Sequence, residues 1–192
     1  MQVNFVPETV VPEGVGTLRS QLSRDILHAA NATLLPPKAQ IQAFADSYFQ
    51  HLYHRAPIVD HEDLAVEEPS ILLTQVICLI GSLLRHPGIQ STVEESEQYY
   101  NKVKALLYTN YERDPRLVLK ALCLLGFRNI TPPKVISLDC SWHWIGMAAR
   151  LAYQIGLHRE STYSQLKNPG NARRIMWFLF VSFYLKIISH LG

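Results

Sequence analysis

The 192-residue sequence has few cysteines and little excess of charge of either sign. Cys78, Cys123 and Cys140 form no CxxC pair, so the chain cannot build a zinc ribbon or a thioredoxin-type site locally. All three lie in apolar surroundings, and we expect buried, unreactive thiols. Lysine and arginine total 18 against 16 acidic residues, a net charge of +2, and they are dispersed. A module that binds nucleic acid through a concentrated basic face is therefore excluded.

The sequence also lacks targeting and membrane-spanning segments of the usual form. Its beginning has neither the basic segment nor the apolar run of a secretory signal peptide, which favours a reducing intracellular compartment. The apolar runs at 71–84 and 175–185 are shorter than the roughly 20 residues that a spanning helix needs. We expect two core helices there and no membrane association. Hydrophobic residues make up 48% of the chain, which excludes disorder as its main state.

The spacing of apolar residues predicts an all-α fold, because no stretch alternates strictly between apolar and polar residues. We expect a single domain of about seven helices packed as helical hairpins. We expect residues 1–34 to form a leader that is extended to about Gly16 and then contains one short helix. Residues 35–192 are expected to form the domain. The expected helices cover 18–30, a segment opened by Pro36 and Pro37, 71–84, a segment opened by a capping box at 91–94, 116–125, 139–155 and 171 to the end.

Local residue types also predict how some of these helices begin and end. Asp114 before Pro115 is typical of an N-cap, and Pro132 and Pro133 indicate a linker. Gly126 and Gly156 are expected in the left-handed conformation that stops a helix.

Motifs for catalysis or for phosphate binding are missing: the sequence contains no GxGxxG, GxxxxGK[ST], GxSxG or HExxH. The nearest approach to a metal site is three histidines beside three acids, namely His51, His54, His61, Asp60, Glu62 and Asp63. A closed zinc site needs four placed ligands, which this cluster does not specify. We expect these side chains to be solvated.

The segment 139–159 is the most informative part of the sequence. Its spacing predicts a helix with one packed face, on which Trp142, Ile145, Ala149, Ala152 and Tyr153 lie. Gly146 would allow another helix to approach closely, and Leu157 would supply the apolar contact that accompanies the stop at Gly156.

This segment resembles the central signature of the fungal-specific transcription factor domain, the middle homology region of fungal binuclear zinc-cluster regulators. The matching residues are Asp139, Trp142, Trp144, Gly146, Ala148, Arg150, Ala152, Gly156, Leu157, His158 and Arg159. The resemblance extends over about 35–192. Its other parts are an aromatic pair with Pro-Ile and an acid (Tyr48, Phe49, Pro57, Ile58, Asp60), a middle helix at 122–125, and an Arg-Arg-x-x-Trp motif (Arg173, Arg174, Trp177).

The sequence departs from the family pattern in three ways. Phe183 and Tyr184 stand where the family has Asp-Arg, which would weaken buried ionic contacts. The chain stops before the family's Arg-Pro continuation, so we expect a domain incomplete at its C-terminus. The six-cysteine zinc cluster is missing, so zinc and DNA binding would belong only to a module absent from this chain.

The resemblance implies a nuclear, non-enzymatic regulatory domain that holds no cofactor of its own and acts through protein partners, self-association or a small effector. It marks Arg150, His158, Arg159, Arg173 and Arg174 as structural or regulatory, although cations that cap helix ends explain them as well. A groove exposing Trp177, Phe178 and Phe180 would favour self-association or a partner helix. The alternative is a small all-α ligand-binding protein, or an enzyme assisted by a metal at His51 and His54.

Overall fold

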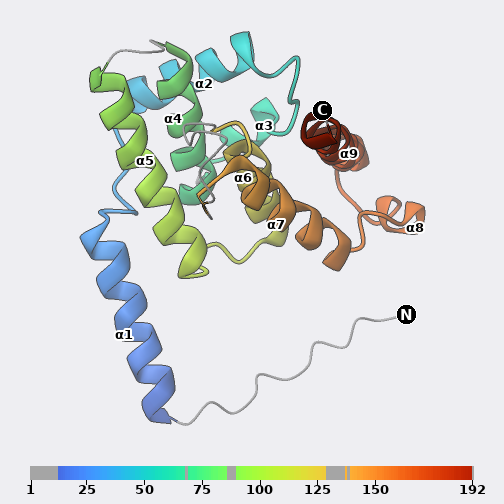
Figure 1. Cartoon of the computed structure of the whole chain (residues 1–192). Coiled ribbons are helices and arrows are strands. Elements are labelled where there is room, and N and C mark those ends of the chain that lie inside the picture. Colours follow the sequence, from blue (N-terminus) through green and yellow to red (C-terminus); the bar gives the residue numbers. More distant parts are fainter. Residues whose placement is uncertain (1–12, 68, 86–89, 129–136, 138, 192) are drawn as a thin grey trace.

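The computed structural model describes residues 13–67, 69–85, 90–128, 137 and 139–191, and these residues form an all-α domain (Figure 1). Two of its nine helices, α3 and α8, are single turns, which explains why the sequence predicted only about seven. The helices are α1 (Glu13–Ala29), α2 (Lys38–His51), α3 (His61–Leu64), α4 (Ile71–Arg85), α5 (Gln90–Tyr108), α6 (Pro115–Leu125), α7 (Ser141–Gln154), α8 (Glu160–Tyr163) and α9 (Pro169–Leu191).

Helix α4 is the centre of the domain, as its nearly uniform apolar composition predicted. It packs against α2, α5 and α6, and residues 72–82 are all buried. The buried amide of Gln75 on this helix donates to the carbonyls of Ala32 and Leu34, at 3.0 and 2.9 Å. These bonds tie the segment that precedes α2 to the core.

Helix α1 differs from the prediction because it begins at Glu13, so Gly16 lies inside a helix and not in an extended leader. The helix projects from the body of the domain and makes its main helix contact with α5 (Figure 1). Leu18 and Leu22 are consequently exposed. Residues 1–12, the rest of the predicted leader, lie outside the described residues.

Three other predictions concern helix starts and a linker. Helix α5 begins at Gln90, so Ser91 lies within the helix and is not its N-cap; the side chain of Ser91 is outside the described part of the structure. Asp114 does cap α6, because its carboxylate accepts the backbone N–H of Arg116 at 2.9 Å. The linker with Pro132 and Pro133 falls among the residues that the structure does not describe.

Close helix packing decides the role of two glycines. At Gly126 φ is −60°, so the predicted left-handed stop is wrong. A Cβ at that position would lie 2.3 Å from Cδ1 of Ile145, so this glycine allows α7 to approach the end of α6. At Gly81, a Cβ would lie 2.4 Å from Cβ and 2.6 Å from Cα of Phe44, which makes glycine necessary for the contact between α4 and α2.

The end of α7 confirms the predicted Schellman motif. Gly156 has φ +80°, its N–H donates to the carbonyl of Tyr153 at 3.1 Å, and the N–H of Leu157 donates to the carbonyl of Ala152 at 3.0 Å. The side chain of Leu157 is buried. The chain therefore turns sharply from α7 into α8.

The predicted packed face of α7 is partly wrong. Trp142 and Tyr153 are 45% and 61% exposed, whereas Trp144 and Ala148 are buried together with Ile145 and Ala152. Gly146 allows no close approach, since nothing would lie within 4 Å of its Cβ. Residues two apart on a helix point in different directions, so the two tryptophans cannot both face the core of the domain. The rings of Tyr100 and Tyr108 on α5 pack against Trp144.

Two of the three cysteines are buried, as the sequence predicted, and the third is not. Cys78 and Cys123 are fully buried, and burial raises the pKa of the Cys78 thiol to about 12. Cys140, at the start of α7, is only half-buried. Among the described helices, none has both the length and the apolar character needed to cross a bilayer.

Gly81→Ala should destabilise the domain by about 2 kcal/mol or more, because the added methyl group meets the backbone of Phe44 and overpacks the contact. Urea unfolding monitored by circular dichroism measures the change. Gly146→Ala is the matched control, since its methyl group enters open space and removes a helix-interior glycine. It should stabilise by up to about 1 kcal/mol, and equal losses in both variants would contradict the packing assignment.

Candidate functional site

The candidate site is the junction between the segment 56–60 and the first turns of α9. Tyr48 on α2 organises that segment: its hydroxyl donates to the carbonyl of Ala56 at 2.7 Å and accepts the N–H groups of Ile58 and Val59 at 3.3 and 3.1 Å. All these residues are buried, so the hydroxyl satisfies backbone groups that water does not reach. Burial raises the pKa of Tyr48 to about 12, which keeps the hydroxyl neutral at physiological pH.

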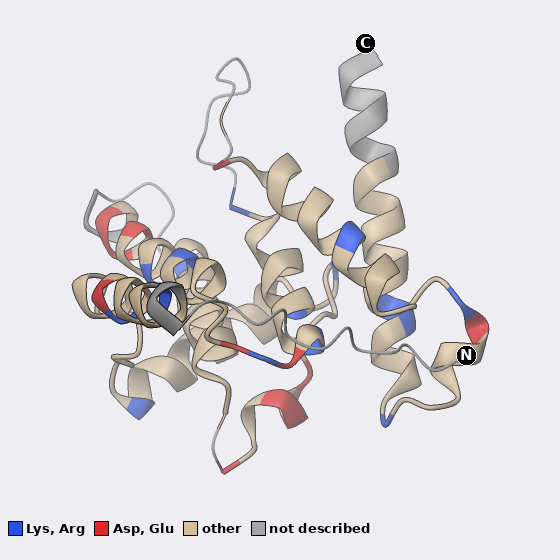
Figure 2. Cartoon of the chain, turned by 90° about the horizontal axis from the view of Figure 1, so that it is seen from below, with Lys and Arg blue, Asp and Glu red and all other residues tan. Residues whose placement is uncertain are grey.

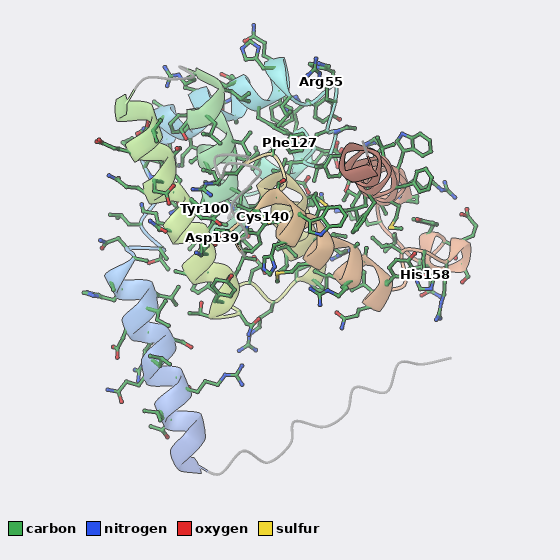
Figure 3. The ribbon with its side chains drawn as sticks, in the orientation of Figure 1. Arg55, Tyr100, Phe127, Asp139, Cys140 and His158 are labelled. Atoms are coloured by element: carbon green, nitrogen blue, oxygen red, sulfur yellow. The ribbon has the colours of Figure 1, made fainter. Side chains whose placement is uncertain are left out.

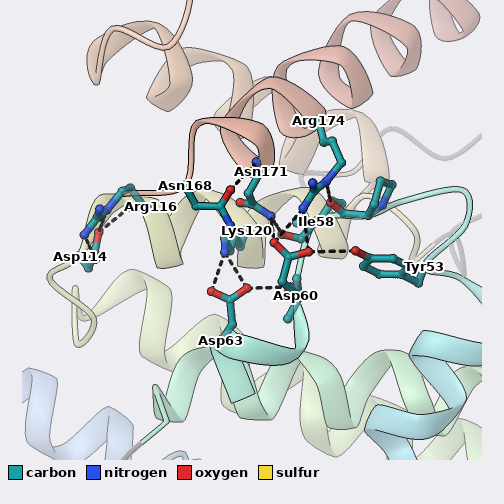
Figure 4. Close-up of polar contacts among 12 residues, drawn as sticks. Tyr53, Ile58, Asp60, Asp63, Asp114, Arg116, Lys120, Asn168, Asn171 and Arg174 are labelled. Carbon is teal, nitrogen blue, oxygen red and sulfur yellow. Dashed lines mark hydrogen bonds and ion pairs between the residues drawn. The ribbon is translucent and has the colours of Figure 1, made fainter. Parts of the chain in front are cut away.

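Asp60 ends this segment and is contacted by the side chain of Tyr53, seven residues earlier, and by side chains of α9, far away in the sequence (Figure 4). Nη2 of Arg174 on α9 lies 2.7 Å from both carboxylate oxygens, and Nε of Arg174 donates to the carbonyl of Pro57 at 3.2 Å. The hydroxyl of Tyr53 donates to Oδ1 of Asp60 at 2.9 Å, and this bond to a carboxylate raises the pKa of Tyr53.

Asn171 adds a second tie between α9 and the same segment. Its amide donates to the carbonyl of Ile58 and to Oδ2 of Asp60, both at 2.9 Å. Asn171 is buried, and the Asp60 side chain is 16% exposed. The structure thus joins the Pro-Ile-acid motif to the Arg-Arg motif, more than 110 residues later in the sequence.

The Asp60 junction continues into α3 and α6 through a second ion pair. Nζ of Lys120 lies 2.7 Å from both oxygens of Asp63, whose Oδ2 also accepts the N–H of Asp60 at 2.7 Å. Side-chain exposure is only 10% for Lys120 and 19% for Asp63. The carboxylates of Asp60 and Asp63 are therefore both neutralised by buried or half-buried cations.

A cleft of about 530 Å³ lies beside these pairs. Its polar lining includes Glu62, Arg116, Lys167 and Asn168, and its apolar lining includes Leu117, Leu157, Leu166 and Ile175. Glu62 and Lys167 make no ion pair with the described residues. The cleft thus offers charge of both signs over an apolar floor.

The residues predicted from the signature segment are dispersed. Asp139 lies beside α5, where Nζ of Lys104 is 2.8 Å from its carboxylate and the hydroxyl of Tyr100 donates to it at 3.0 Å (Figure 3). The bond from Lys104 lowers the pKa of Asp139. His158 and Arg159 contact each other near α8, away from Asp139 (Figure 3). Arg150 is exposed.

The two adjacent arginines of α9 have unequal roles. Arg174 enters the Asp60 junction, whereas Arg173 pairs with Glu160 at the surface, where the side chains are 56% and 77% exposed. The guanidinium of Arg173 also lies 5.0 Å from the centre of the Tyr163 ring. The sequence identified both arginines as candidates, but it could not predict which of the two forms the half-buried contact.

The aromatic residues of α9 also differ from one another in their exposure to solvent. Trp177 and Phe180 are 68% and 63% exposed, and their rings stack 5.8 Å apart. Phe178, predicted to be exposed, instead stacks on Phe127 at 5.4 Å and is half-buried. Phe183 replaces a polar family residue and packs its ring 5.5 Å from that of Trp142.

The histidine cluster does not converge on one point. Within the described residues, no group of three or more histidine, cysteine, aspartate or glutamate side chains could hold an ion. His61 stacks flat on Phe49 at 3.6 Å, and the carboxylates of Asp60 and Asp63 are occupied by Arg174 and Lys120. These neighbours therefore supply no further ligands to a metal at His51 and His54.

The sequence reasoning missed several residues that build the junction, above all the Tyr48 hydroxyl, Asn171 and Lys120. Lys120 gave no signal because a lysine within a helix is common. Tyr48 was recognised as part of the aromatic pair, but the bonds of its hydroxyl were not predicted. Asn171 carried a local signal, since it follows Asn168-Pro169 at the start of a helix, but its partners come from another part of the fold.

Comparison with known proteins decides the family. The fungal specific transcription factor domain matches residues 45–182, which include both halves of the Asp60 junction. The chain belongs to this family. No solved structure gives a significant match to it.

Similar proteins are fungal transcription regulators. The domain is 30% identical to cutinase transcription factor 1 alpha of Fusarium vanettenii over 88% of this chain and 21% of that protein. It is 27% identical to the acetamidase regulatory protein of Aspergillus oryzae (84% and 22%) and to the negative regulator of pleiotropic drug resistance STB5 of Candida glabrata (67% and 15%). The chain therefore spans about a fifth or less of the length of these relatives.

Asp60→Ala should destabilise the domain by about 2–4 kcal/mol, because it leaves Arg174, Asn171 and Tyr53 without their shared acceptor. Urea unfolding measures the loss. In a double-mutant cycle with Arg174→Ala, the double variant should lose less than the sum of the two single variants.

The exposed ion pair of the same helix provides the control. Glu160→Gln should change stability by no more than about 0.5 kcal/mol, since solvent screens the Arg173–Glu160 pair. Additive effects at Asp60 and Arg174, or an equal loss in Glu160→Gln, would contradict the assignment of Asp60 as the junction.

Proposed function

We propose that this chain is the regulatory part of a fungal zinc-cluster transcription factor and acts in the nucleus without contacting DNA itself. The family match over residues 45–182 carries the proposal. The matched relatives are named as transcription factors or regulators, not as enzymes. Lysine and arginine are dispersed over several helices and loops, which also supports a module that does not bind DNA (Figure 2).

The proposed mechanism works through contacts with other proteins or with a second copy of the chain. Three cysteines cannot form a six-cysteine zinc cluster, so zinc and DNA binding would come from another module of a longer regulator. The exposed aromatic residues Trp177 and Phe180 provide an apolar surface for such contacts. The Asp60 junction holds α9 in the position that presents this surface.

A reporter assay tests the regulatory function. The 192 residues are inserted between a heterologous DNA-binding module and an activating segment, and transcription is measured in a fungal reporter strain. Because the domain offers a contact surface, we expect reporter output to differ at least about threefold from that of a fusion carrying an unrelated helical domain of similar length.

Matched variants separate a specific effect from simple spacing. Asp60→Ala should abolish the difference by disrupting the fold, while Glu160→Gln should retain it. Equal output from the domain and from the unrelated insert would contradict the proposal.

A second candidate function is binding of a small effector, which the cleft beside Asp63 and Lys120 favours. Its volume of about 530 Å³ falls within the range of small-molecule sites, and its lining combines both charges with apolar side chains. A small zwitterionic or amphiphilic metabolite would match this chemistry.

Thermal unfolding with amino acids and small organic acids at millimolar concentration tests effector binding. A bound compound should raise the Tm by at least about 2 °C, because it stabilises only the folded state. Leu166→Trp should abolish the shift by filling the cleft, and Tyr153→Ala, on a different surface, should keep it. Equal shifts in both variants, or none with any compound, would contradict binding in this cleft.

A further inference from the structure

A groove of about 340 Å³ runs beside the exposed face of α9. Seven described residues line it: Arg55, Pro57, Arg173, Arg174, Trp177, Phe178 and Val181. Apart from the arginines, its walls are apolar, and the indole of Trp177 forms an exposed edge that continues onto Phe180. The groove can therefore cover an apolar side chain on several sides.

The charge of this groove has one sign. Three of its seven lining residues are arginines and none is acidic. The side chain of Arg55 is exposed and makes no hydrogen bond or ion pair with the described residues. Arg173 pairs with Glu160 and lies 5.0 Å from the centre of the Tyr163 ring. Because both side chains of the ion pair are exposed, a competing carboxylate displaces Glu160 at little cost. Two guanidinium groups are thus available to a ligand.

The walls of the groove are held in place before any ligand binds. Arg174 is fixed by Asp60 and by the carbonyl of Pro57. The ring of Phe178 is stacked on Phe127. A ligand would therefore not have to order these side chains, which lowers the entropic cost of binding.

We propose that this groove binds an acidic peptide segment of a partner protein that also carries a bulky apolar side chain. Carboxylates of the peptide pair with Arg55 and Arg173, and its apolar side chain packs between Trp177 and Val181. Arginine forks suit bidentate carboxylate binding, and Trp and Arg are the residue types that dominate protein interfaces. The inference rests on the proposed function in that it names the chemistry of one partner.

The same observations disfavour the other occupants of such a groove. A symmetric dimer through this face would place the arginines of two copies against each other, where like charges repel. Nucleic acid requires a longer track of cations than two available arginines, and the chain has a net charge of only +2.

Fluorescence anisotropy with the full 192-residue chain tests the proposal. The probe is a fluorescein-labelled peptide of about 15 residues that alternates Asp or Glu with Leu or Phe. We expect saturable binding that weakens as salt is raised. A peptide with Asn and Gln in place of the acids should bind at least about tenfold more weakly.

Surface variants locate the binding site without disturbing the core. The double variant Arg55→Gln, Arg173→Gln and the single variant Trp177→Ala should each weaken binding at least about tenfold. Arg113→Gln and Tyr153→Ala, an exposed arginine and an exposed aromatic residue outside the groove, should bind the peptide like the unmodified chain. Circular dichroism verifies that every variant is folded.

Three results would overturn the proposal. The first is absence of binding, or equal binding by the groove variants and the controls. The second is equal affinity for single-stranded DNA or for phosphatidylserine vesicles, lost in the same variants, which would indicate a general anion-binding surface. The third is a dimer in light scattering that the groove variants dissociate, which would make a second copy the occupant.

The reporter assay distinguishes failure of this inference from failure of the proposed function. If reporter output changes but the peptide does not bind, only the groove assignment is wrong. If the peptide binds at the groove but the reporter does not respond, the regulatory function is wrong and the peptide site stands.

Discussion

The structure depends on how the buried segment between α2 and α3 satisfies its backbone polar groups. This segment forms a turn and a bend and no helix, so it makes few of the internal hydrogen bonds of a helix, and its residues Ala56, Ile58 and Val59 are fully buried. The Tyr48 hydroxyl supplies one donor and accepts two N–H groups, and the amide of Asn171 caps the carbonyl of Ile58. Because these bonds fix the segment, Asp60 is held at a defined position, and α9 docks onto it through Arg174.

The difference in burial between the two arginine pairs of α9 connects stability to function. Arg174 and Asp60 form a half-buried pair with additional hydrogen bonds, and a helix docked in this way keeps its orientation. Arg173, one residue earlier on α9, pairs with Glu160 of α8, and both side chains are exposed and can exchange partners. The Arg-Arg motif therefore supplies one arginine that fixes α9 and a second, Arg173, that can bind a ligand. Trp177 lines the same apolar groove as Arg173.

Most of the helices could be predicted from the sequence. The predictions were wrong where tertiary packing decides between residues that fit the helical pattern equally well. The stop at Gly156 could be predicted because a Schellman motif is local. The role of Gly126 could not, because its conformation is ordinary and its lack of a side chain serves Ile145 of another helix. Trp142 and Trp144 fit the core equally well by residue type, and only tertiary contacts, among them those with Tyr100 and Tyr108 of α5, bury Trp144. The sequence showed the two motifs of the candidate site separately. The hydrogen bonds that join Asp60 to Arg174 and Asn171 link residues more than 110 positions apart.

The sequence by itself determined the all-α class, the family and the absence of a complete zinc cluster, because these follow from apolar periodicity, ordered motifs and the number of cysteines. The tertiary structure alone decided which motif residues meet. It placed Arg174 in the junction and left Arg173 at the surface, turned Phe178 inward and left Trp177 exposed. The physical reason is that adjacent residues on a helix differ in direction by about 100°, so their roles depend on where the neighbouring elements pack.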